Sequence, residues 1–426
     1  LMIESPKSVR LHIGIFGRTN SGKSSILNLI TAQETSIVSP IAGTTTDVVR
    51  KSMELLPLGP VTFLDTAGID DSGQVGELRV KRSREALSSS DIVLLVCEVN
   101  CWTAYEEEVL SLCKAQNTPV IILVNKVDTS SPSESFTALI KQNDSRTVFL
   151  SALNAQRDAQ ARENFMSSLK HLLITLCPES FLEPPAILGD LLPSGSSLPL
   201  VVLVVPIDLQ APKGRLILPQ VQSIRDALDS DAAVLVVKER EMRALLDSLS
   251  RKPDLVVCDS QVALKMVADT PDDVPCTTFS ILFSRFKGNI ETMAAGAAAI
   301  NKLQHNDKVL MAEACTHHAL EDDIGRVKIP RWLREYTGLE LDITHACGKD
   351  YPQDLSSYSL AIHCGACTLT RREMLWRIEQ ARLSGVPVTN YGMAISALQG
   401  VIERTLSPFP SALEAYRTAL AKGGTD

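Results

Sequence analysis

The 426-residue chain is too long for a single hydrophobic core and predicts roughly three domains. Its 45% hydrophobic and 22% charged residues are ordinary for a folded protein, whereas the formal net charge of −8 argues against broad electrostatic binding to nucleic acid. No apolar run reaches the about 18 residues of a membrane span, and the first residues lack a basic segment followed by an apolar one. We therefore expect a cytoplasmic protein whose partners include neither membrane nor nucleic acid.

Short β-branched runs alternate with amphipathic stretches from end to end, which is typical of parallel sheets with helical crossovers. We predict an α/β fold of three consecutive α/β domains, the first with a mostly parallel sheet. The predicted limits are a first domain at 1–177, a linker rich in Pro, Gly and Ser at 178–199, a central domain at 200–272 and a third domain at 273–426. The first domain's expected strands are 11–16, 61–64, 92–96, 120–124 and 148–150.

The central domain carries no catalytic signature, so we expect it to serve in structure or association. Its expected strands are 200–205, 233–237 and 255–258, and its expected helices are 218–228, 239–249 and 262–267. In the third domain we expect strands at 279–283, 308–312, 340–344, 359–362 and 386–389, and helices at 290–303, 329–336, 371–383 and 394–405.

A phosphate-binding loop joins the first strand to the first helix. Residues 17–24 read Gly-Arg-Thr-Asn-Ser-Gly-Lys-Ser, the P-loop pattern in its strand–loop–helix setting. Its glycines let backbone N–H groups approach phosphates, Lys23 offers a charge to the outer phosphates, and Ser24 offers a hydroxyl to Mg²⁺. The predicted phosphate-site residues are Gly17, Asn20, Ser21, Gly22, Lys23, Ser24 and Ser25.

Downstream motifs identify the nucleotide as GTP. Asp65 and Gly68 follow a predicted strand, where the carboxylate can hold Mg²⁺ through water and the amide can meet the γ-phosphate. Asp128, in Asn-Lys-Val-Asp, can accept from guanine N1–H and the exocyclic amine, a pairing that adenine cannot make. The predicted base-site residues are Asn125, Lys126, Asp128, Ser151 and Ala152. The first domain is therefore predicted to be a P-loop GTPase.

The GTPase motifs resemble those of the Era and tRNA-modification group. That resemblance implies that Thr45 reaches Mg²⁺ and that Asn20 helps hold a K⁺ ion, which acts as a fixed positive charge on the phosphates. Ile69 stands where Ras-like proteins carry the water-orienting Gln, so unaided turnover should be slow. Glu77 falls where the tRNA-modification relatives carry a water-orienting Glu. The predicted catalytic residues are Lys23, Thr45, Asp65, Gly68 and Glu77.

Two groups of cysteines and histidines each follow a predicted strand of the third domain in the sequence. Cys315 and His317 follow strand 308–312, and His363, Cys364 and Cys367 follow strand 359–362. Open α/β sheets place their ligand sites at the carboxyl ends of strands, so these residues should meet. Thiolates and imidazoles at this spacing suit Zn²⁺ or an iron–sulfur cluster, and the spacing alone does not separate the two. Cys347 and His318, which lie at the same rim, could be spare ligands or bystanders.

The GTPase motifs together with Cys-x-His and, 45 residues later, His-Cys-x-x-Cys resemble the FeFe-hydrogenase maturation GTPases of the HydF type. The resemblance implies a 4Fe–4S cluster on Cys315, Cys364 and Cys367, with an exchangeable fourth ligand, either His317 or His363. It also implies a homodimer formed through the central domain. The chain would act as a scaffold and carrier for a di-iron precursor, with two radical-SAM maturation enzymes and the apo-hydrogenase as partners.

Two other functions compete with this one. The first is an Era-like GTPase with a structural zinc site, acting in RNA or ribosome maturation. The acidic net charge and the absence of a basic or aromatic RNA-binding segment count against it. The second is a zinc metallochaperone that uses GTP hydrolysis as a release switch.

Overall fold

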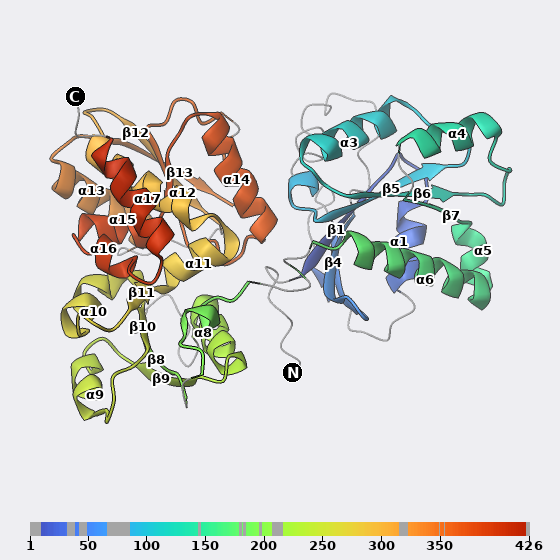
Figure 1. Cartoon of the computed structure of the whole chain (residues 1–426). Coiled ribbons are helices and arrows are strands. Elements are labelled where there is room, and N and C mark those ends of the chain that lie inside the picture. The colour runs from blue at the N-terminus through green and yellow to red at the C-terminus, as the bar shows by residue number, and fades with distance from the viewer. Residues whose placement is uncertain are drawn as a thin grey trace. The chain divides into compact units, whose positions relative to one another are not determined.

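The chain folds as two compact units, residues 1–184 and residues 185–426, which are described separately below (Figure 1). The computed structural model describes residues 10–31, 39–41, 49–65, 86–143, 146–178, 181, 185–195, 198–206, 216–314, 323–348, 350–352 and 354–422. The boundary between the units falls inside the predicted linker. Ile187 and Leu188, from the same segment, are buried in the core of the second unit. The domain limits predicted from the sequence stay predictions.

The described residues of the first unit form a seven-stranded sheet of order β2-β3-β4-β1-β5-β6-β7. Strands β4, β1, β5, β6 and β7 run parallel, and β2 and β3 add an antiparallel edge. The strands are β1 (Leu11–Phe16), β2 (Ser39–Ile41), β3 (Val49–Leu55), β4 (Gly59–Asp65), β5 (Ile92–Glu98), β6 (Val120–Asn125) and β7 (Thr147–Phe149). The central strands are buried on both faces, as parallel strands between helical layers must be.

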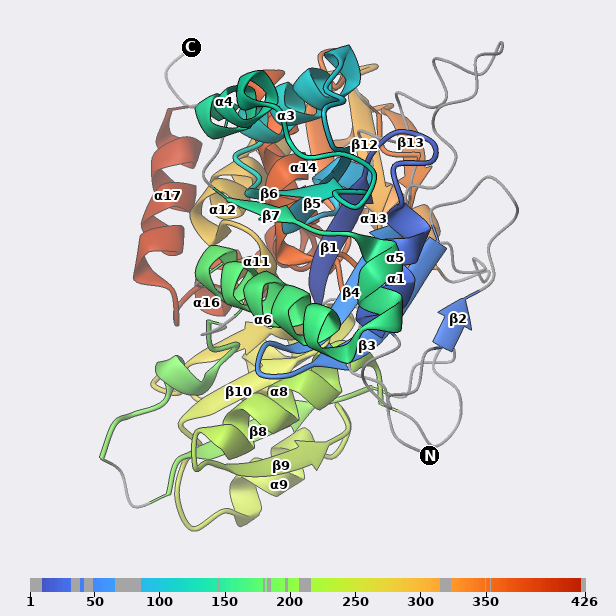
Figure 2. The same ribbon diagram turned by 90° about the vertical axis from the view of Figure 1, so that its right-hand side faces the viewer.

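Helices cover both faces of this sheet. One face carries α1 (Lys23–Thr31), α5 (Ala152–Arg157) and α6 (Ala159–Leu176), and the other carries α3 (Ala104–Ala115) and α4 (Glu134–Asn143), as Figure 2 shows. The buried apolar side chains form two clusters, one for each face of the sheet. The predicted α/β class and the predicted P-loop domain with a mostly parallel sheet are confirmed.

The second unit contains two four-stranded parallel sheets. One has the order β11-β10-β8-β9 and the other the order β13-β12-β14-β15. The strands are β8 (Leu200–Val204), β9 (Ala233–Val237), β10 (Leu255–Cys258), β11 (Cys276–Thr278), β12 (Lys308–Glu313), β13 (Asp342–Cys347), β14 (Leu360–His363) and β15 (Val388–Asn390). One continuous cluster of buried side chains includes residues of both sheets, so the two share a core.

Helices of the second unit alternate with its strands in the chain (Figure 1). They are α8 (Leu218–Asp229), α9 (Met242–Ser248), α10 (Ala263–Asp269), α11 (Phe279–Lys287), α12 (Ile290–Ala297), α13 (Ile329–Thr337), α14 (Arg371–Leu383), α15 (Tyr391–Leu398), α16 (Ile402–Thr405) and α17 (Pro410–Ala421). No helix within the described residues is long and apolar enough to cross a membrane.

One predicted strand is wrong: residues 279–283 begin helix α11. Thr278 caps this helix, its hydroxyl oxygen accepting a hydrogen bond of 3.2 Å from the Ile281 N–H. A short run that is apolar at nearly every position fits a buried strand and a buried helix equally well, and the sequence pattern alone could not separate them. The preceding strand, β11, pairs with β10 and so belongs to the first sheet of this unit. The predicted helix 290–303 forms as α12 and continues directly as a 3-10 helix, Ala298–Lys302, whereas 394–405 is divided between α15 and α16.

Candidate functional sites

The P-loop has the geometry of a phosphate cradle. Its lysine, Lys23, is buried at the start of α1, and its ammonium donates hydrogen bonds to the carbonyl of Gly17 and to that of Arg18 (2.7 Å). Ser24 and Ser25, in the first turn of the same helix, are exposed. Asn20 is also exposed and has a left-handed backbone conformation with φ 66°. The loop is thus folded around its lysine, with its polar tip open to solvent.

Glycine is required at two positions of this loop. A Cβ on Gly17 would lie 2.2 Å from the Val96 carbonyl oxygen, and one on Gly22 would lie 2.0 Å from Asn125 Nδ2. Both glycines also have positive φ, 151° and 100°, which side chains disfavour. The loop can therefore pack directly on the end of β5 and on the Asn-Lys-Val-Asp segment.

Asn125 joins the phosphate side of the site to the base side. Its Nδ2 donates to the Ser21 carbonyl (2.9 Å), and its Oδ1 accepts from the Ala152 N–H (3.0 Å). Ser151, beside it, caps α5. Asp128 is exposed at the end of this segment, open to a base. The structure thus brings together the predicted residues of the phosphate and base sites.

Asp65 lies buried at the carboxyl end of β4, next to β1 and hence beside the P-loop. That position suits a carboxylate that holds Mg²⁺ through water. Three predicted catalytic residues, Thr45, Gly68 and Glu77, lie outside the described residues.

The P-loop has an anchor, Glu106, that was not predicted from the sequence. The fully buried Glu106 accepts from Arg18 Nε at 3.2 Å with one carboxylate oxygen. Its other oxygen accepts from Thr103 N–H (2.9 Å) and Thr103 Oγ1 (2.6 Å), which completes a capping box on α3. Arg18 also contacts Cys101 Sγ at 2.6 Å. A Thr followed three residues later by Glu does predict the capping box, but nothing in the sequence links that Glu to the P-loop.

The second site lies at the carboxyl edge of the sheet formed by β12–β15. Strands β12 and β14 are parallel neighbours, with Ala312 opposite His363. Cys364 follows directly: its N–H donates to the Ala312 carbonyl (2.9 Å), and its Sγ accepts from the Ala314 N–H (3.1 Å). The two predicted strands thus belong to one sheet and are neighbours in it. Cys364 and Cys367 are both half-buried there.

A buried lysine holds the loop that carries these two cysteines. Lys287, at the end of α11, is 1% exposed, and its ammonium donates to the carbonyls of Ala366 (2.8 Å), Cys367 (3.0 Å) and Leu369 (2.8 Å). Burial lowers the pKa of Lys287 to about 8, against the opposing effect of the nearby Cys367 and Cys364. The lysine belongs to the helix mistaken for a strand, so its role had no signal in the sequence pattern.

His363 and Cys347 have different surroundings. His363 is fully buried, with its ring 5.4 Å from the Tyr351 ring, and burial holds its pKa well below the usual value. Cys347, at the end of β13, lies 3.1 Å from both Glu313 Oε2 and Arg326 Nη2. Burial, followed by the Glu313 carboxylate, raises the pKa of Cys347. The role of His363 as a ligand stays a prediction, and so does that of Cys347 as a spare ligand or a bystander.

Cys315 and His317, two of the five predicted metal ligands, lie outside the described residues. Among the residues that are described, no three His, Cys, Asp or Glu side chains converge on a common point that could hold a metal ion. The predicted ligand set is therefore not tested as a whole.

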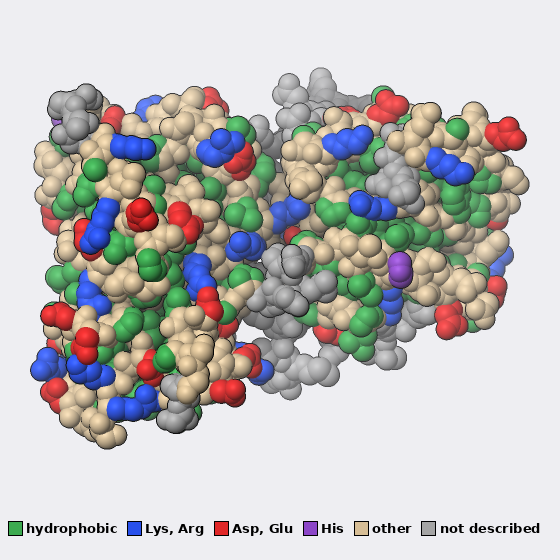
Figure 3. Space-filling model, viewed as in Figure 1, with side chains coloured by type: hydrophobic (Ala, Val, Ile, Leu, Met, Phe, Trp, Pro, Cys, Tyr) green, Lys and Arg blue, Asp and Glu red, His purple; other side chains and the backbone are tan. Residues whose placement is uncertain are grey.

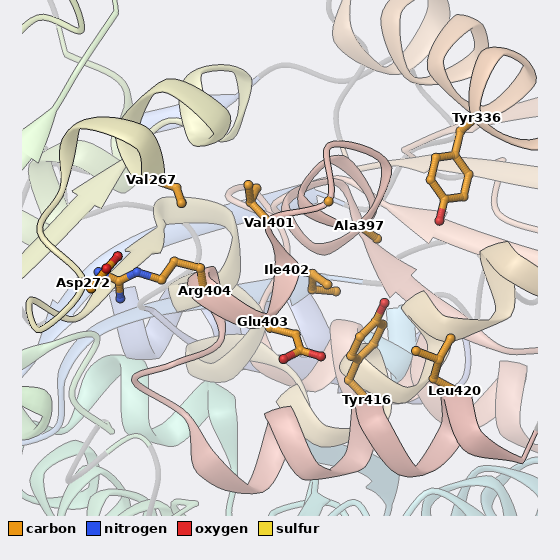
Figure 4. Close-up of a pocket in the computed structure, with 11 residues that line it drawn as sticks. Val267, Asp272, Tyr336, Ala397, Val401, Ile402, Glu403, Arg404, Tyr416 and Leu420 are labelled. Carbon is orange, nitrogen blue, oxygen red and sulfur yellow. The ribbon is translucent and has the colours of Figure 1, made fainter.

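An open hollow of about 460 Å³ lies elsewhere in the second unit (Figure 4). Its walls include Arg404, Glu403 and Tyr416, and the side chains of Arg404 and Glu403 already have partners. Arg404 donates to the carbonyls of Pro271 (2.7 Å) and Val274 (2.6 Å), and Glu403 pairs with Arg417 at 2.5 Å. This hollow contains none of the predicted site residues.

Three family models match consecutive parts of the chain. Residues 12–126 match a 50S ribosome-binding GTPase, residues 187–288 a hydrogen maturase F dimerization domain, and residues 291–408 a hydrogen maturase F tetramerization domain. Fold and site thus define a P-loop GTPase extended by further α/β domains. The two domains that follow the GTPase make the chain a member of the hydrogen maturase F (HydF) family, and the resemblance found in the sequence is confirmed.

Similar curated proteins match the GTPase region. The tRNA modification GTPase MnmE of Nostoc sp. is 40% identical over 120 residues, which are 28% of this chain and 26% of that protein. GTPase Era of Nostoc sp. is 34% identical over 195 residues, 42% of this chain and 58% of that protein. The chain thus spans about a quarter of the MnmE relative and less than two thirds of Era.

Part of the chain is also similar to solved structures. Era of Aquifex aeolicus bound to GDP and AlF₄⁻ has a TM-score of 0.31 and 21% identity, covering 53% of this chain and 92% of that chain. The G domain of the T. maritima FeoB iron transporter has a TM-score of 0.30 and 18% identity, covering 40% of this chain and 99% of that chain.

Proposed function

We propose that this GTPase is a scaffold and carrier that binds a 4Fe–4S cluster through Cys315, Cys364 and Cys367. Its cargo is the di-iron precursor of the FeFe-hydrogenase active site, delivered to the apo-hydrogenase after assembly with two radical-SAM maturation enzymes. The observation that carries the proposal is the position of the Cys364–Cys367 loop. This loop lies beside the end of β12 and within a hydrogen maturase F domain. Strand β12 ends at Glu313, and Cys315 follows two residues later in the sequence.

The residues present fit an anionic iron–sulfur cluster. Two half-buried thiols lie on one loop, and the third follows the neighbouring strand. Two buried cations, Lys287 and Arg377, interact electrostatically with Cys364, so positive charge lies close to this loop. Three cysteines would hold three irons of a cubane and leave one corner for an exchangeable ligand, with His317 and His363 as the proposed candidates. When bound, such a cluster supplies an iron site that accepts a further ligand.

GTP hydrolysis is the switch in this proposal. Lys23 and the P-loop amides hold the phosphates, while Ser24, Thr45 and Asp65 hold Mg²⁺. Asn20, exposed at the tip of the loop, would help to hold a K⁺ ion that stabilises charge on the phosphates. Because Ile69 cannot orient water, unaided turnover is slow, with Glu77 as the proposed water-orienting residue. The K⁺ ion beside Asn20 stimulates it. Asn20→Ala should therefore remove the K⁺ stimulation of phosphate release.

Self-association through the central domain is part of the same proposal. The domain matches a dimerization model, and its outermost strand, β9, carries side chains that are only partly buried. Val236 on this strand is 48% exposed, and Leu228 on the adjacent α8 is 55% exposed. An exposed strand edge with apolar neighbours is the kind of surface that a second copy covers.

Anaerobic reconstitution with iron and sulfide, followed by absorbance and EPR spectroscopy, tests the proposal. We expect a brown protein with cluster spectra, and a Cys364→Ala variant with a markedly lower iron content. Buried Cys258→Ala serves as the matched control and should load like the wild type. A colourless protein that retains one tight zinc per chain would contradict the proposal and favour a structural zinc site. The competing function is that of an Era-like GTPase with such a zinc site, acting in RNA or ribosome maturation. The similarity of the GTPase region to Era and MnmE is the observation that favours it.

A further inference from the structure

The ammonium of Lys287 is buried against the loop that carries Cys364 and Cys367. It donates hydrogen bonds to the carbonyls of Ala366, Cys367 and Leu369 at 2.8, 3.0 and 2.8 Å. A lysine ammonium has three donors and no acceptor, so this one is fully satisfied by a single loop. Among the described residues, Glu373 is the carboxylate that interacts with it electrostatically, and the carbonyls provide its hydrogen bonds. Hydrogen bonding of this kind is what a buried charge requires.

Carbonyls that point to Lys287 fix the direction of the loop's N–H groups. A peptide unit is planar and trans, so its N–H points opposite to its carbonyl. The N–H groups of Cys367 and Thr368 therefore point away from the lysine. Ala366 has φ 51°, a left-handed conformation unusual for a residue with a side chain, and the hydrogen bond to its carbonyl helps to hold it there. Successive N–H groups beside a left-handed residue form a concavity that suits anions.

We propose that Lys287 is a positioning residue for an anionic metal–sulfur cluster on the Cys364–Cys367 loop. Its hydrogen bonds turn the loop's N–H groups toward the cluster, and its charge offsets that of the thiolates. The inference rests on the cluster binding proposed above and adds a residue that sets the electrostatics of that site.

Charge and hydrogen bonding are both recognised determinants of iron–sulfur reduction potentials. The reduced cluster carries one more negative charge than the oxidised cluster, so a nearby ammonium stabilises the reduced form more. Removing that charge should shift the midpoint potential to a more negative value. A residue that only supported the fold would leave the potential of the loaded protein unchanged.

The test compares the full-length wild type with Lys287→Gln, which keeps a donor but lacks the charge, and with Lys287→Arg, which keeps the charge. Lys302→Gln removes an exposed charge from the same unit and is the matched control. Each protein is reconstituted anaerobically with iron and sulfide, and folding is checked by circular dichroism. The readouts are the midpoint potential from a dye-mediated titration and the rate of iron loss to a chelator. Lys287→Met, which fills the same space, replaces the glutamine variant if the latter does not fold.

We expect Lys287→Gln to load iron but to lose it roughly tenfold faster and to have a more negative potential. Lys287→Arg should lie nearer the wild type in potential, and Lys302→Gln should match the wild type. Neutral variants with the wild-type potential and rate of iron loss would overturn the role of Lys287 alone. If the wild type itself takes up no cluster, the proposed function fails, and the inference that rests on it fails as well.

Discussion

Glu106 links two parts of the GTPase with its two carboxylate oxygens. One oxygen caps α3 through Thr103, and the other holds Arg18 of the P-loop. The Arg18 carbonyl in turn accepts from Lys23. Because the carboxylate is fully buried, losing it would leave both the guanidinium and the helix start without their partner.

Glu106→Gln should therefore weaken guanine-nucleotide binding by roughly tenfold, since one charge-assisted hydrogen bond contributes about 1.5–3 kcal/mol. Titration of a fluorescent GDP analogue measures the change. Glu107→Gln, at the exposed neighbouring position, is the control and should bind as the wild type does. Equal affinities for all three proteins would show that the P-loop does not need this anchor.

The Cys276 thiol gives the second unit a pH dependence on the alkaline side. Burial raises its pKa to about 11, with Arg404 acting in the opposite direction. The unfolded chain loses this proton near its ordinary value of 9.0, whereas the folded protein keeps it until about pH 11. The free energy of unfolding should therefore fall between these two pH values, by at most about 1.4 kcal/mol per pH unit from this group.

Urea unfolding of the wild type and of Cys276→Ala across this pH window measures the effect. The alanine variant, which lacks the thiol, should lose less stability as the pH rises. Cys258, a buried thiol of the same unit whose pKa burial raises well above its usual value, should keep part of the slope in both proteins. Parallel pH profiles for the two proteins would rule out the contribution of Cys276.

At the scale of elements, close packing between α12 and β15 supports the sheet that carries the cysteine site. The sequence Ala-Ala-Gly-Ala-Ala-Ala at 294–299 predicts close packing of a soluble helix. A Cβ on Gly296 would lie 2.0 Å from the Val388 carbonyl oxygen and 2.5 Å from its carbon. These are backbone atoms of a buried strand and cannot move without disturbing the sheet.

Gly296→Ala should accordingly destabilise the second unit by about 1–3 kcal/mol. The gain of roughly 1 kcal/mol in helix propensity is too small to reverse the sign. Denaturant unfolding followed by circular dichroism measures the loss. Thr292→Ala, exposed on the same helix, should change stability by no more than about 0.5 kcal/mol. An unchanged or more stable Gly296→Ala protein would contradict the close approach.

At the scale of the whole molecule, the nucleotide site and the cysteine site belong to different compact units. Each site is built at the carboxyl ends of parallel strands in its own sheet. Figure 3 shows Lys and Arg side chains interspersed with Asp and Glu side chains over the second unit, so the charge on that face is mixed. Because the two sites belong to different units, we expect that a substitution in one site can abolish its function without affecting the other site.

Lys23→Ala should abolish GTP hydrolysis yet leave anaerobic loading of the cluster unchanged. The physical reason is that the Lys23 ammonium donates to Gly17 and Arg18 of the P-loop in the first unit, whereas the cysteine site belongs to the second unit. Phosphate release and iron content, measured on one preparation, provide the two readouts. Loss of iron in this variant would refute the independence of the two sites.

Val236→Lys should weaken the proposed dimer, because it places a charge on the exposed edge strand β9. Analytical ultracentrifugation should show a smaller species at micromolar concentration. Lys238→Glu, a charge change just beyond the same strand, is the control for net charge. An unaltered mass for Val236→Lys would place the interface elsewhere.

The sequence by itself determined the chemistry of this protein, because its motifs fix residue type, spacing and order. The P-loop at 17–24, the guanine-binding Asn-Lys-Val-Asp and the Cys-x-x-Cys at 364–367 could each be found without coordinates. Strands were predictable where β-branched runs are bounded by turns, as in β1 and β9. Local patterns carry this information, since they act over a few neighbouring residues.

Only the tertiary structure decided which distant residues support the two sites. Glu106 lies 88 residues from Arg18, and Lys287 lies 79 residues from Ala366, so no spacing in the sequence connects either pair. Lys287 was hidden further because its helix begins with the mostly apolar run 279–283, which reads as a strand. Both contacts matter because the charged groups are buried. A buried charge is costly unless it is hydrogen-bonded within the protein, and its partners are the residues that the tertiary structure places nearby.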